Sequence, residues 1–213
     1  MTSKPLNLVC AFDPLCGWCF GFNPVLKKLR SKLGDQAKWR IMSGGLVTGE
    51  RERPIGEMAG YLRSGLEAVY ARTGQRAGDA FYTLMEEGSW VSRSEPACRA
   101  IFVVQQKWPD KAIEFAQNLC NAFYVQGLAP TEAETLVDVA TSCNIPAETL
   151  IALWAEESAK QQTSAEFAKA KSMGVTGYPA LYLANETWGG LQEIMNGCGT
   201  YEDAEAGLNR LTG

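Results

Sequence analysis

The order of hydrophobic patterns along the chain limits its fold more than any other feature. Leu6 to Phe12 is a short apolar run typical of a strand buried on both faces, and Ala37 to Met42 is a second strand pattern. Between them, apolar residues repeat at helical spacing from Gly17 to about Leu33. A strand, a helix and a strand in this order predict a βαβ unit with parallel strands and a right-handed crossover.

A long helical block follows this unit. After Gly49, apolar residues recur every three to four positions over most of the chain that remains. We expect helices at Met58 to Tyr70, Ala80 to Met85, Cys98 to Trp108, Ile113 to Val125, Leu136 to Cys143, and Leu150 to Met173. Ser94 is a candidate N-cap, and Pro146 can open a helix. Thr131 and Glu134 have the spacing of a capping box.

Strand character returns near the C-terminus. Ala180 to Ala184 and Thr187 to Met195 are strand patterns separated by a turn, and Tyr201 to Leu211 is a short helix. The simplest fold with this order is one α/β sheet domain interrupted by an all-helical insertion. We therefore expect residues 1–49 and 174–213 to form the sheet domain and residues 50–173 to form the insertion.

Composition and charge exclude several classes of protein. The 213 residues are 46% hydrophobic and 21% charged, which is typical of a globular chain and not of a disordered one. The formal net charge of -4 is spread along the chain, so we expect no nucleic-acid or membrane partner, and we interpret Lys27, Lys28 and Arg30 as a solvated helix face. The N-terminal apolar run is too short for a secretory signal, and no segment approaches the roughly eighteen apolar residues of a membrane span.

The number of cysteines indicates the cellular compartment of the protein. The chain has seven cysteines, an odd number that would leave a thiol to mispair in an oxidising compartment, so we expect a cytoplasmic protein. Outside one close pair lie Cys10, Cys98, Cys120, Cys143 and Cys198. We interpret these five as small buried apolar residues, with Cys198, which lies between two glycines, as the least certain.

Cys16 and Cys19 form a C-x-x-C motif, CGWC, at the start of the first predicted helix. With seven cysteines, roughly 0.2 such pairs are expected by chance, so the position of the pair carries the argument. A sulfur at the N-terminal end of a helix faces free N–H groups, which favours the thiolate, and Cys19 is placed one turn later to close a disulfide. Zinc would need two further ligands, but the chain has no histidine and no second C-x-x-C, so we expect no metal. A pair that only packs, or forms an inert bridge, is the alternative.

The segment GVTGYPALY, Gly174 to Tyr182, places Pro179 at the start of a predicted strand. If the bond between Tyr178 and Pro179 is cis, the backbone before the proline turns outward, where a bound polypeptide can pair with it as an added strand. An ordinary trans proline after a tight turn is the alternative, and the spacing does not decide between the two.

Together, these motifs resemble the DsbA family of thioredoxin-fold proteins, nearest its cytoplasmic FrnE-like branch. DPLCGWC and GVTGYP carry the resemblance, and SEPACRA (Ser94 to Ala100) and AFYVQGLAPTEAETLVDVA (Ala122 to Ala140) look like the insertion helices of that branch. The resemblance implies an α/β, thioredoxin-like fold with a large all-helical insertion.

The resemblance also implies roles for five residues. Cys16 would be the attacking thiol and Cys19 the resolving thiol, with Pro179 as a cis-proline packed against them. Tyr178 would contact substrate through its backbone, and Trp18 would tune the pair. From its position, the ring of Trp18 either faces the substrate beside the sulfur, which we expect, or covers the end of the helix.

Two features of DsbA relatives are missing from this chain. No histidine lies between the cysteines, so the resemblance does not imply strong oxidising power, and Cys10 occupies a position where this fold often has a carboxylate. The nearest acid is Asp13, which is either a loop residue or a group that handles protons.

These observations predict a thiol-disulfide oxidoreductase without a cofactor, which acts on protein or small-molecule disulfides through a mixed disulfide at Cys16. Disulfide isomerisation is a further activity open to the same site, and glutathione is a candidate partner. The second hypothesis is a redox-sensing adaptor or chaperone that binds a partner protein with the same fold. The third is a glutathione-dependent transferase or isomerase, and Cys16 argues against it because such relatives typically carry serine at this position. The oligomeric state is not indicated.

Overall fold

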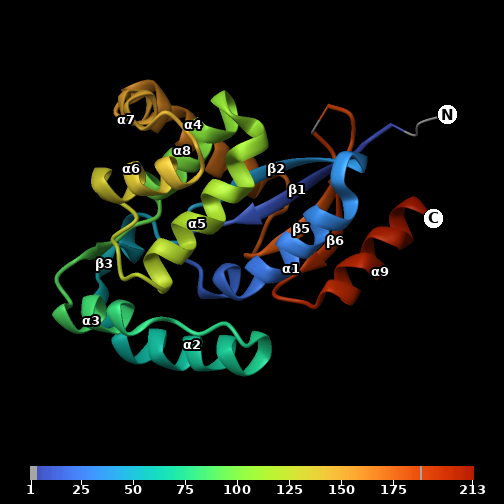
Figure 1. The fold of residues 1–213 in the computed structure, drawn as a ribbon. Coiled ribbons are helices and arrows are strands. Elements are labelled where there is room, and N and C mark those ends of the chain that lie inside the picture. The colour runs from blue at the N-terminus through green and yellow to red at the C-terminus, as the bar shows by residue number, and fades with distance from the viewer. Residues whose placement is uncertain (1–3, 188) are drawn as a thin grey trace.

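A four-stranded mixed sheet forms the centre of the fold, and the computed structural model describes residues 4–187 and 189–213 (Figure 1). The strands are β1 (Leu6–Phe12), β2 (Ala37–Ser43), β5 (Ala180–Ala184) and β6 (Leu191–Asn196), in the spatial order β2-β1-β5-β6. β1 is parallel to β2, and β5 is antiparallel to both β1 and β6. Because helix α1 (Gly17–Leu33) connects β1 to β2, the predicted βαβ unit is confirmed.

The last strand is shorter than expected. The prediction began it at Thr187, whereas β6 begins at Leu191. The cause is a turn built by Asn185, whose Oδ1 accepts hydrogen bonds from the backbone N–H groups of Thr187 (3.2 Å) and Gly189 (3.0 Å). Residue 188 of the expected strand lies outside the described residues, as do residues 1–3 of the N-terminal segment.

Seven α-helices lie between β2 and β5 in the described residues, where six were expected. They are α2 (Ala59–Thr73), α3 (Asp79–Glu87), α4 (Glu95–Lys107), α5 (Ala112–Tyr124), α6 (Ala133–Ser142), α7 (Ala147–Trp154) and α8 (Glu157–Ser172), and α9 (Tyr201–Thr212) follows β6. The predicted helix from Leu150 to Met173 is divided because Glu156 adopts an extended conformation, with ψ at 136°. None of the helices described combines the length and apolar content needed to cross a membrane.

The insertion is helical, as expected, apart from one short pair of strands. β3 (Arg53–Pro54) and β4 (Val91–Ser92) pair as a small antiparallel sheet. Short 3₁₀ segments also lie in the chain, at η1 (Gly34–Gln36), η2 (Gly49–Arg51), η3 (Ile55–Met58) and η4 (Pro109–Lys111).

The predicted helix starts are confirmed only in part. Pro146 immediately precedes α7, as expected. Ser94 occupies the N-cap position of α4, but its Oγ accepts a hydrogen bond from the backbone N–H of Val47 at 2.9 Å and does not cap the helix. Thr131 is not a capping residue, because its hydroxyl accepts a hydrogen bond from Trp90 Nε1 at 3.0 Å and α6 begins later. Both hydroxyls bind distant segments, which local spacing does not predict.

Helices cover the sheet on both faces (Figure 1). Successive side chains of a strand point to opposite faces. On one face, Leu8 packs with Leu26 of α1 and Leu208 of α9 in the larger hydrophobic core. On the other face, Val9 packs in a smaller cluster with Ala170 of α8. β1 is therefore buried on both sides, as its apolar sequence predicts.

The insertion also closes the outer edge of β2. The backbone N–H of Ile41 donates to Gln105 Oε1 of α4 at 2.9 Å, and the N–H of Ser43 donates to Glu166 Oε1 of α8 at 2.9 Å. Side chains thus take the place of a neighbouring strand along this half of the edge, which keeps it from pairing with another chain.

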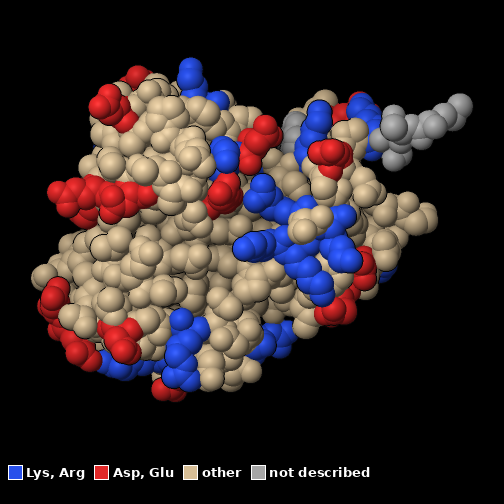
Figure 2. Space-filling model, viewed as in Figure 1, with Lys and Arg blue, Asp and Glu red and all other residues tan. Residues whose placement is uncertain are grey.

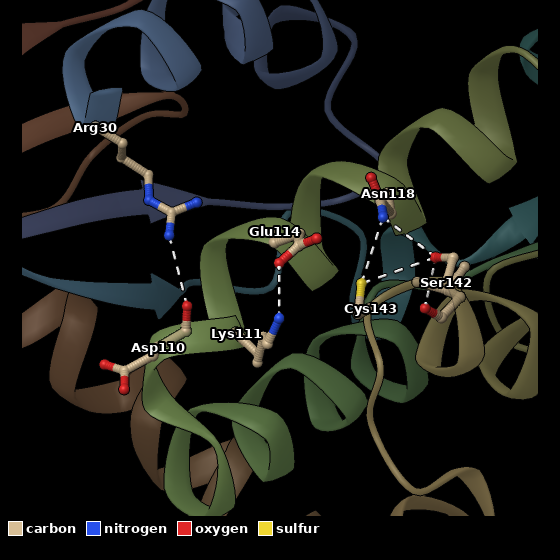
Figure 3. Close-up of polar contacts among 8 residues, drawn as sticks. Arg30, Asp110, Lys111, Glu114, Asn118, Ser142 and Cys143 are labelled. Carbon is tan, nitrogen blue, oxygen red and sulfur yellow. Dashed lines mark hydrogen bonds and ion pairs between the residues drawn. The ribbon is translucent and has the colours of Figure 1, made fainter. Parts of the chain in front are cut away.

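Basic side chains gather over α1 (Figure 2). Lys27 and Lys28 are exposed, which agrees with a solvated helix face. Arg30 is half-buried and reaches across to the backbone carbonyl of Asp110 at 3.5 Å (Figure 3), within a groove of about 850 Å³. Arg30 and Lys32 lie in the last turn of α1, where cations offset the negative end of the helix dipole.

Candidate active site

Cys16 lies where β1 has ended and α1 begins. It is the N-cap residue of α1, with extended backbone angles (φ -88°, ψ 113°), and its carbonyl accepts a hydrogen bond from the N–H of Phe20 at 3.1 Å. Its own N–H donates to the carbonyl of Asp13 at 3.0 Å, which closes a tight turn ahead of the helix. Its side chain is 6% exposed. The sulfur therefore stands at the positive end of the helix, as predicted.

The pKa values of the two thiols in the CGWC motif are shifted in opposite directions. The pKa of Cys16 is lowered, first by a hydrogen bond from the Cys19 thiol and then by backbone N–H groups of Cys19 and Trp18, against the effects of burial and of the Asp13 carboxyl. Burial raises the pKa of Cys19 well above its ordinary value, and the contact with Cys16 raises it further. This asymmetry favours a thiolate on Cys16 and a proton held on Cys19.

All seven cysteines lie within the described residues and are free thiols, so the pair is in its reduced form. The exposed side of the pair belongs to Cys16, because the Cys19 side chain is completely buried. The sulfur of Cys16 is therefore the one that a substrate can approach.

Tyr178, the residue before Pro179, lies directly against Cys16. The peptide bond between Tyr178 and Pro179 is cis, and the thiol of Cys16 donates to the carbonyl of Tyr178 at 3.5 Å. The Pro179 carbonyl accepts a hydrogen bond from Gly197 at 2.8 Å, which ties this loop to the end of β6. The Tyr178 ring lies on Gly44, where a Cβ atom would come within 1.4 Å of the phenolic oxygen. Glycine at position 44 is thus needed for the ring to occupy this place.

An open groove of about 510 Å³ adjoins the pair. Trp18 and Tyr178 line it, together with Arg72, Cys198 and Asp203. Trp18 is partly buried and is one of the residues that line this groove. Arg72 Nε donates to the backbone carbonyl of Cys198 at 2.8 Å, which leaves other guanidinium N–H groups toward the groove.

Four of the other five cysteines are buried. Cys10, Cys98 and Cys120 have no exposed side-chain surface, and burial raises the pKa of each, to about 12 for Cys10. Cys143 is also buried, and its sulfur accepts a hydrogen bond from Asn118 Nδ2 at 3.3 Å (Figure 3). These four fit the interpretation as small buried residues, whereas Cys198 is partly exposed in the groove.

Asp13 is buried behind the Cys16 turn. Its Oδ1 accepts from the N–H of Leu15 at 2.9 Å, and its Oδ2 accepts from the N–H of Leu46 at 2.7 Å and from the Cys98 thiol at 3.7 Å. Burial raises the pKa of this carboxyl, and the hydrogen bonds that it accepts oppose the rise. Asp13 therefore fastens the active-site turn to the segment after β2, in addition to any effect of its charge on Cys16.

Tyr124 of α5 is a site residue that the sequence did not suggest. Its hydroxyl donates to the carbonyl of Leu15 at 2.6 Å, and its ring stacks on Phe20 with 5.1 Å between the ring centres. The side chain is 1% exposed. A residue of the insertion thus holds the peptide that precedes Cys16, and only the three-dimensional fold brings the two together.

Comparison with known proteins gives consistent similarities. The sequence profile described as DSBA-like thioredoxin domain matches residues 8–197. A candidate protein disulfide isomerase from Nitrosomonas europaea is 28% identical, with a TM-score of 0.84 over 98% of both chains. The cytosolic disulfide reductase DsbM from Pseudomonas aeruginosa is 24% identical, with a TM-score of 0.77 over 97% of this chain and 98% of that one. A structure of DsbM with GSH has a TM-score of 0.75, at 97% and 99% coverage.

One relative of this chain is an adapter protein. The ClpXP adapter protein SpxH of Bacillus subtilis (strain 168) is 22% identical over 183 residues. The matched region is 85% of this chain but 59% of SpxH, so the chain spans about three fifths of that relative's length.

Proposed function

This chain belongs to the family of DSBA-like thioredoxin domains, and on that premise we propose that it is a thiol-disulfide oxidoreductase whose attacking thiol is Cys16. Membership confirms the resemblance drawn from the sequence and the predicted thioredoxin-like fold with a helical insertion. In this proposal residues 1–49 and 174–213 form the redox domain, and residues 50–173 form the insertion that covers it.

The reaction begins when the Cys16 thiolate attacks a disulfide R–S–S–R′. A bond forms between Cys16 and the sulfur that bears R, the old disulfide bond breaks, and R′S⁻ leaves and takes a proton from solvent. Cys19 then loses its proton and attacks the sulfur of Cys16, which releases RS⁻ and leaves a Cys16–Cys19 disulfide. The substrate gains two electrons and the cysteine pair loses two. Reaction in the reverse direction oxidises a dithiol, and exchange that stops at the mixed disulfide permits isomerisation.

The observation that supports this mechanism best is the placement of the two thiols: Cys16 is the N-cap residue of α1 and has the exposed side of the pair, whereas Cys19 is completely buried. The opposite directions of their pKa shifts agree with this placement. A nucleophile must be a thiolate near neutral pH, and a resolving thiol must keep its proton until the mixed disulfide forms. In the first step the Cys19 thiol stabilises the Cys16 thiolate through its hydrogen bond. Once Cys16 is joined to substrate, that charge is gone and Cys19 loses a cause of its raised pKa.

We assign substrate binding to Trp18, Tyr178 and Pro179. The Tyr178 backbone lies beside Cys16, where an extended peptide or the backbone of glutathione can pair with it. The groove has room for a tripeptide thiol, and Arg72 offers a positive charge to its carboxylate. Glutathione is therefore our proposed small-molecule partner, and the DsbM structure with GSH supports that choice. The odd number of cysteines, seven, supports a cytoplasmic location.

The test uses two variants and a matched control. Cys16→Ser is expected to abolish reduction of glutathione disulfide, whereas Cys19→Ser is expected to accumulate a mixed disulfide on Cys16, detected by intact mass and peptide mapping. Cys143→Ser, which removes a buried thiol far along the chain, should keep activity. Full activity in Cys16→Ser would show that the proposed nucleophile is wrong.

Similarity to SpxH supports a second candidate, an adaptor that binds a partner protein. In this alternative the cysteine pair senses redox state or has no role in binding. Pull-down of a defined partner by a Cys16→Ser/Cys19→Ser double variant, with the same affinity as the unaltered chain, would favour it over the oxidoreductase.

A further inference from the structure

A second hollow, of about 220 Å³, lies next to the residue that precedes Cys16. Leu15 and Leu46 line it from the active-site side, and Leu62 and Phe123 line it from the insertion. Among the described residues, it shares no lining residue with the groove formed by Trp18 and Tyr178. The second hollow thus reaches Leu15, one residue before Cys16, and the groove reaches Trp18, two residues after Cys16.

The geometry of disulfide exchange requires space for two groups. A thiolate attacks one sulfur of a disulfide while the other sulfur leaves, and the attacking, central and leaving sulfurs approach a straight line. The two substituents of the substrate therefore extend from Cys16 toward different surfaces. The groove beside Trp18 can hold one substituent, and the second hollow is available to the other.

The size and lining of this hollow define what fits. A dry cavity of about 150 Å³ is enough to bind benzene, so 220 Å³ accommodates one ring and a few further atoms. Most of the lining is apolar, and it includes Ile55 and Met58 in addition to the leucines. Tyr61, another lining residue, is 78% exposed, so a large aromatic ring is open to solvent at the edge of the hollow.

Two arginines give the hollow a charge preference. Arg51 donates to the Gly45 carbonyl at 3.2 Å and to the Thr48 hydroxyl at 3.4 Å, and Arg53 donates to the Glu50 carbonyl at 3.0 Å. No carboxylate of the described residues lies within 4.0 Å of either guanidinium. Both side chains are exposed and retain N–H groups that can bind a carboxylate of a ligand.

We propose that this hollow is a specificity site for the second half of the substrate disulfide, and that it takes a small apolar thiol that carries a carboxylate. The inference rests on the proposed function. The complete substrate would be a mixed disulfide between glutathione and such a thiol acid, with glutathione in the groove beside Trp18 and the ring of the thiol acid among the apolar residues. Arg51 and Arg53 would bind the carboxylate.

The reaction on this substrate balances with glutathione as the reductant. Cys16 attacks the glutathione sulfur, the Cys16–glutathione bond forms, and the thiol acid leaves from the hollow as a thiolate that gains a proton. Cys19 then displaces glutathione and closes the Cys16–Cys19 disulfide. Two further glutathione molecules reduce that disulfide and leave as glutathione disulfide.

The test compares two probes that differ in charge alone. They are the glutathione mixed disulfides of 2-mercapto-3-phenylpropanoate and of its amide, and kcat/KM is measured for each with glutathione as reductant. We expect the acid to be preferred about tenfold in the unaltered protein, since a charge-assisted hydrogen bond is lost with the amide. Arg51→Gln and Arg53→Gln should each lower this ratio by about threefold or more. Arg63→Gln is the matched control, because Arg63 lies on α2, pairs with Glu86 at 2.6 Å and does not line the hollow, so it should leave the ratio unchanged.

A second variant tests the apolar part of the site. Leu62→Trp should fill the hollow and reduce kcat/KM for both aromatic probes relative to the mixed disulfide of glutathione with 2-mercaptoethanol. Equal kcat/KM for acid and amide, or a ratio that the arginine variants do not change, would overturn the proposed site while turnover that requires Cys16 still stands. Turnover of every probe by Cys16→Ser would instead overturn the proposed function on which the site depends.

Discussion

Replacing Tyr124 with phenylalanine tests whether the insertion holds the active-site turn. The substitution removes the hydroxyl that donates to the Leu15 carbonyl at 2.6 Å but keeps the ring that stacks on Phe20. Because the ring remains, no large cavity forms. The Leu15 carbonyl loses a buried donor, for which we expect a cost of roughly 1–3 kcal/mol in the free energy of unfolding. For a chain of this length, each kcal/mol corresponds to a fall in Tm of about 2–4 °C.

The assay for Tyr124→Phe has two readouts. Urea unfolding followed by circular dichroism gives the change in free energy, and thiolate absorbance near 240 nm gives the pKa of Cys16. We expect both a loss of stability and a rise in the pKa of Cys16, because release of the Leu15 carbonyl lets the Cys16 turn move away from the N–H groups that stabilise the thiolate. Tyr70→Phe, on the exposed tyrosine of α2, is the control and should change neither readout. An unfolding free energy within about 0.5 kcal/mol of the unaltered protein, with the same Cys16 pKa, would refute the reasoning.

Three further predictions concern other groups at the active site, namely Asp13, Gly44 and the Cys16 thiol. Asp13→Asn should lower the unfolding free energy by roughly 1–3 kcal/mol, because an amide N–H₂ group would then face a backbone N–H. The same substitution should lower the pKa of Cys16, because it removes a negative charge. An unchanged urea midpoint would contradict this prediction. Gly44→Ala should displace the Tyr178 ring and lower the unfolding free energy by roughly 1–3 kcal/mol. Gly65→Ala in α2, where the new methyl group meets no atom within 4 Å, should be neutral or stabilising. Equal unfolding curves for the two variants would refute the packing argument. The pKa of Cys16 is lower in the folded than in the unfolded chain, so the stability that its thiolate contributes is present above the unfolded pKa and is lost as pH falls through the folded pKa. The difference in unfolding free energy between the unaltered protein and Cys16→Ser should therefore grow with pH. A difference that stays constant with pH in urea titrations would exclude a depressed pKa.

The fold was predictable to the extent that it depends on local pattern. β1 is buried on both faces and its sequence is continuously apolar, so the position of the first strand and the βαβ unit followed directly. Helical periodicity located the insertion but not the break near Glu156, because the spacing of apolar residues continues across it. The β3–β4 pair was missed because each strand contributes two residues, too few to show an alternating pattern.

The site was predictable only where the residues are joined by motif. The position of Cys16 at the start of α1 followed from local sequence, whereas its contact with Tyr178 joins segments 162 positions apart. Tyr124 lies more than a hundred positions from Leu15 in the sequence, and nothing in the helical pattern of α5 distinguishes its hydroxyl from that of any buried tyrosine. The role of Asp13 was open for the same reason, since its partner Leu46 comes from another segment.

The most direct test of the account is to equilibrate the protein in glutathione buffers of graded redox poise, trap the free thiols, and map every disulfide by mass spectrometry. We predict one disulfide, between Cys16 and Cys19, that forms cooperatively with poise while Cys10, Cys98, Cys120 and Cys143 stay reduced. If Cys16 and Cys19 form no disulfide at any poise, or if Cys16 pairs with another cysteine in preference to Cys19, the proposed redox mechanism is contradicted.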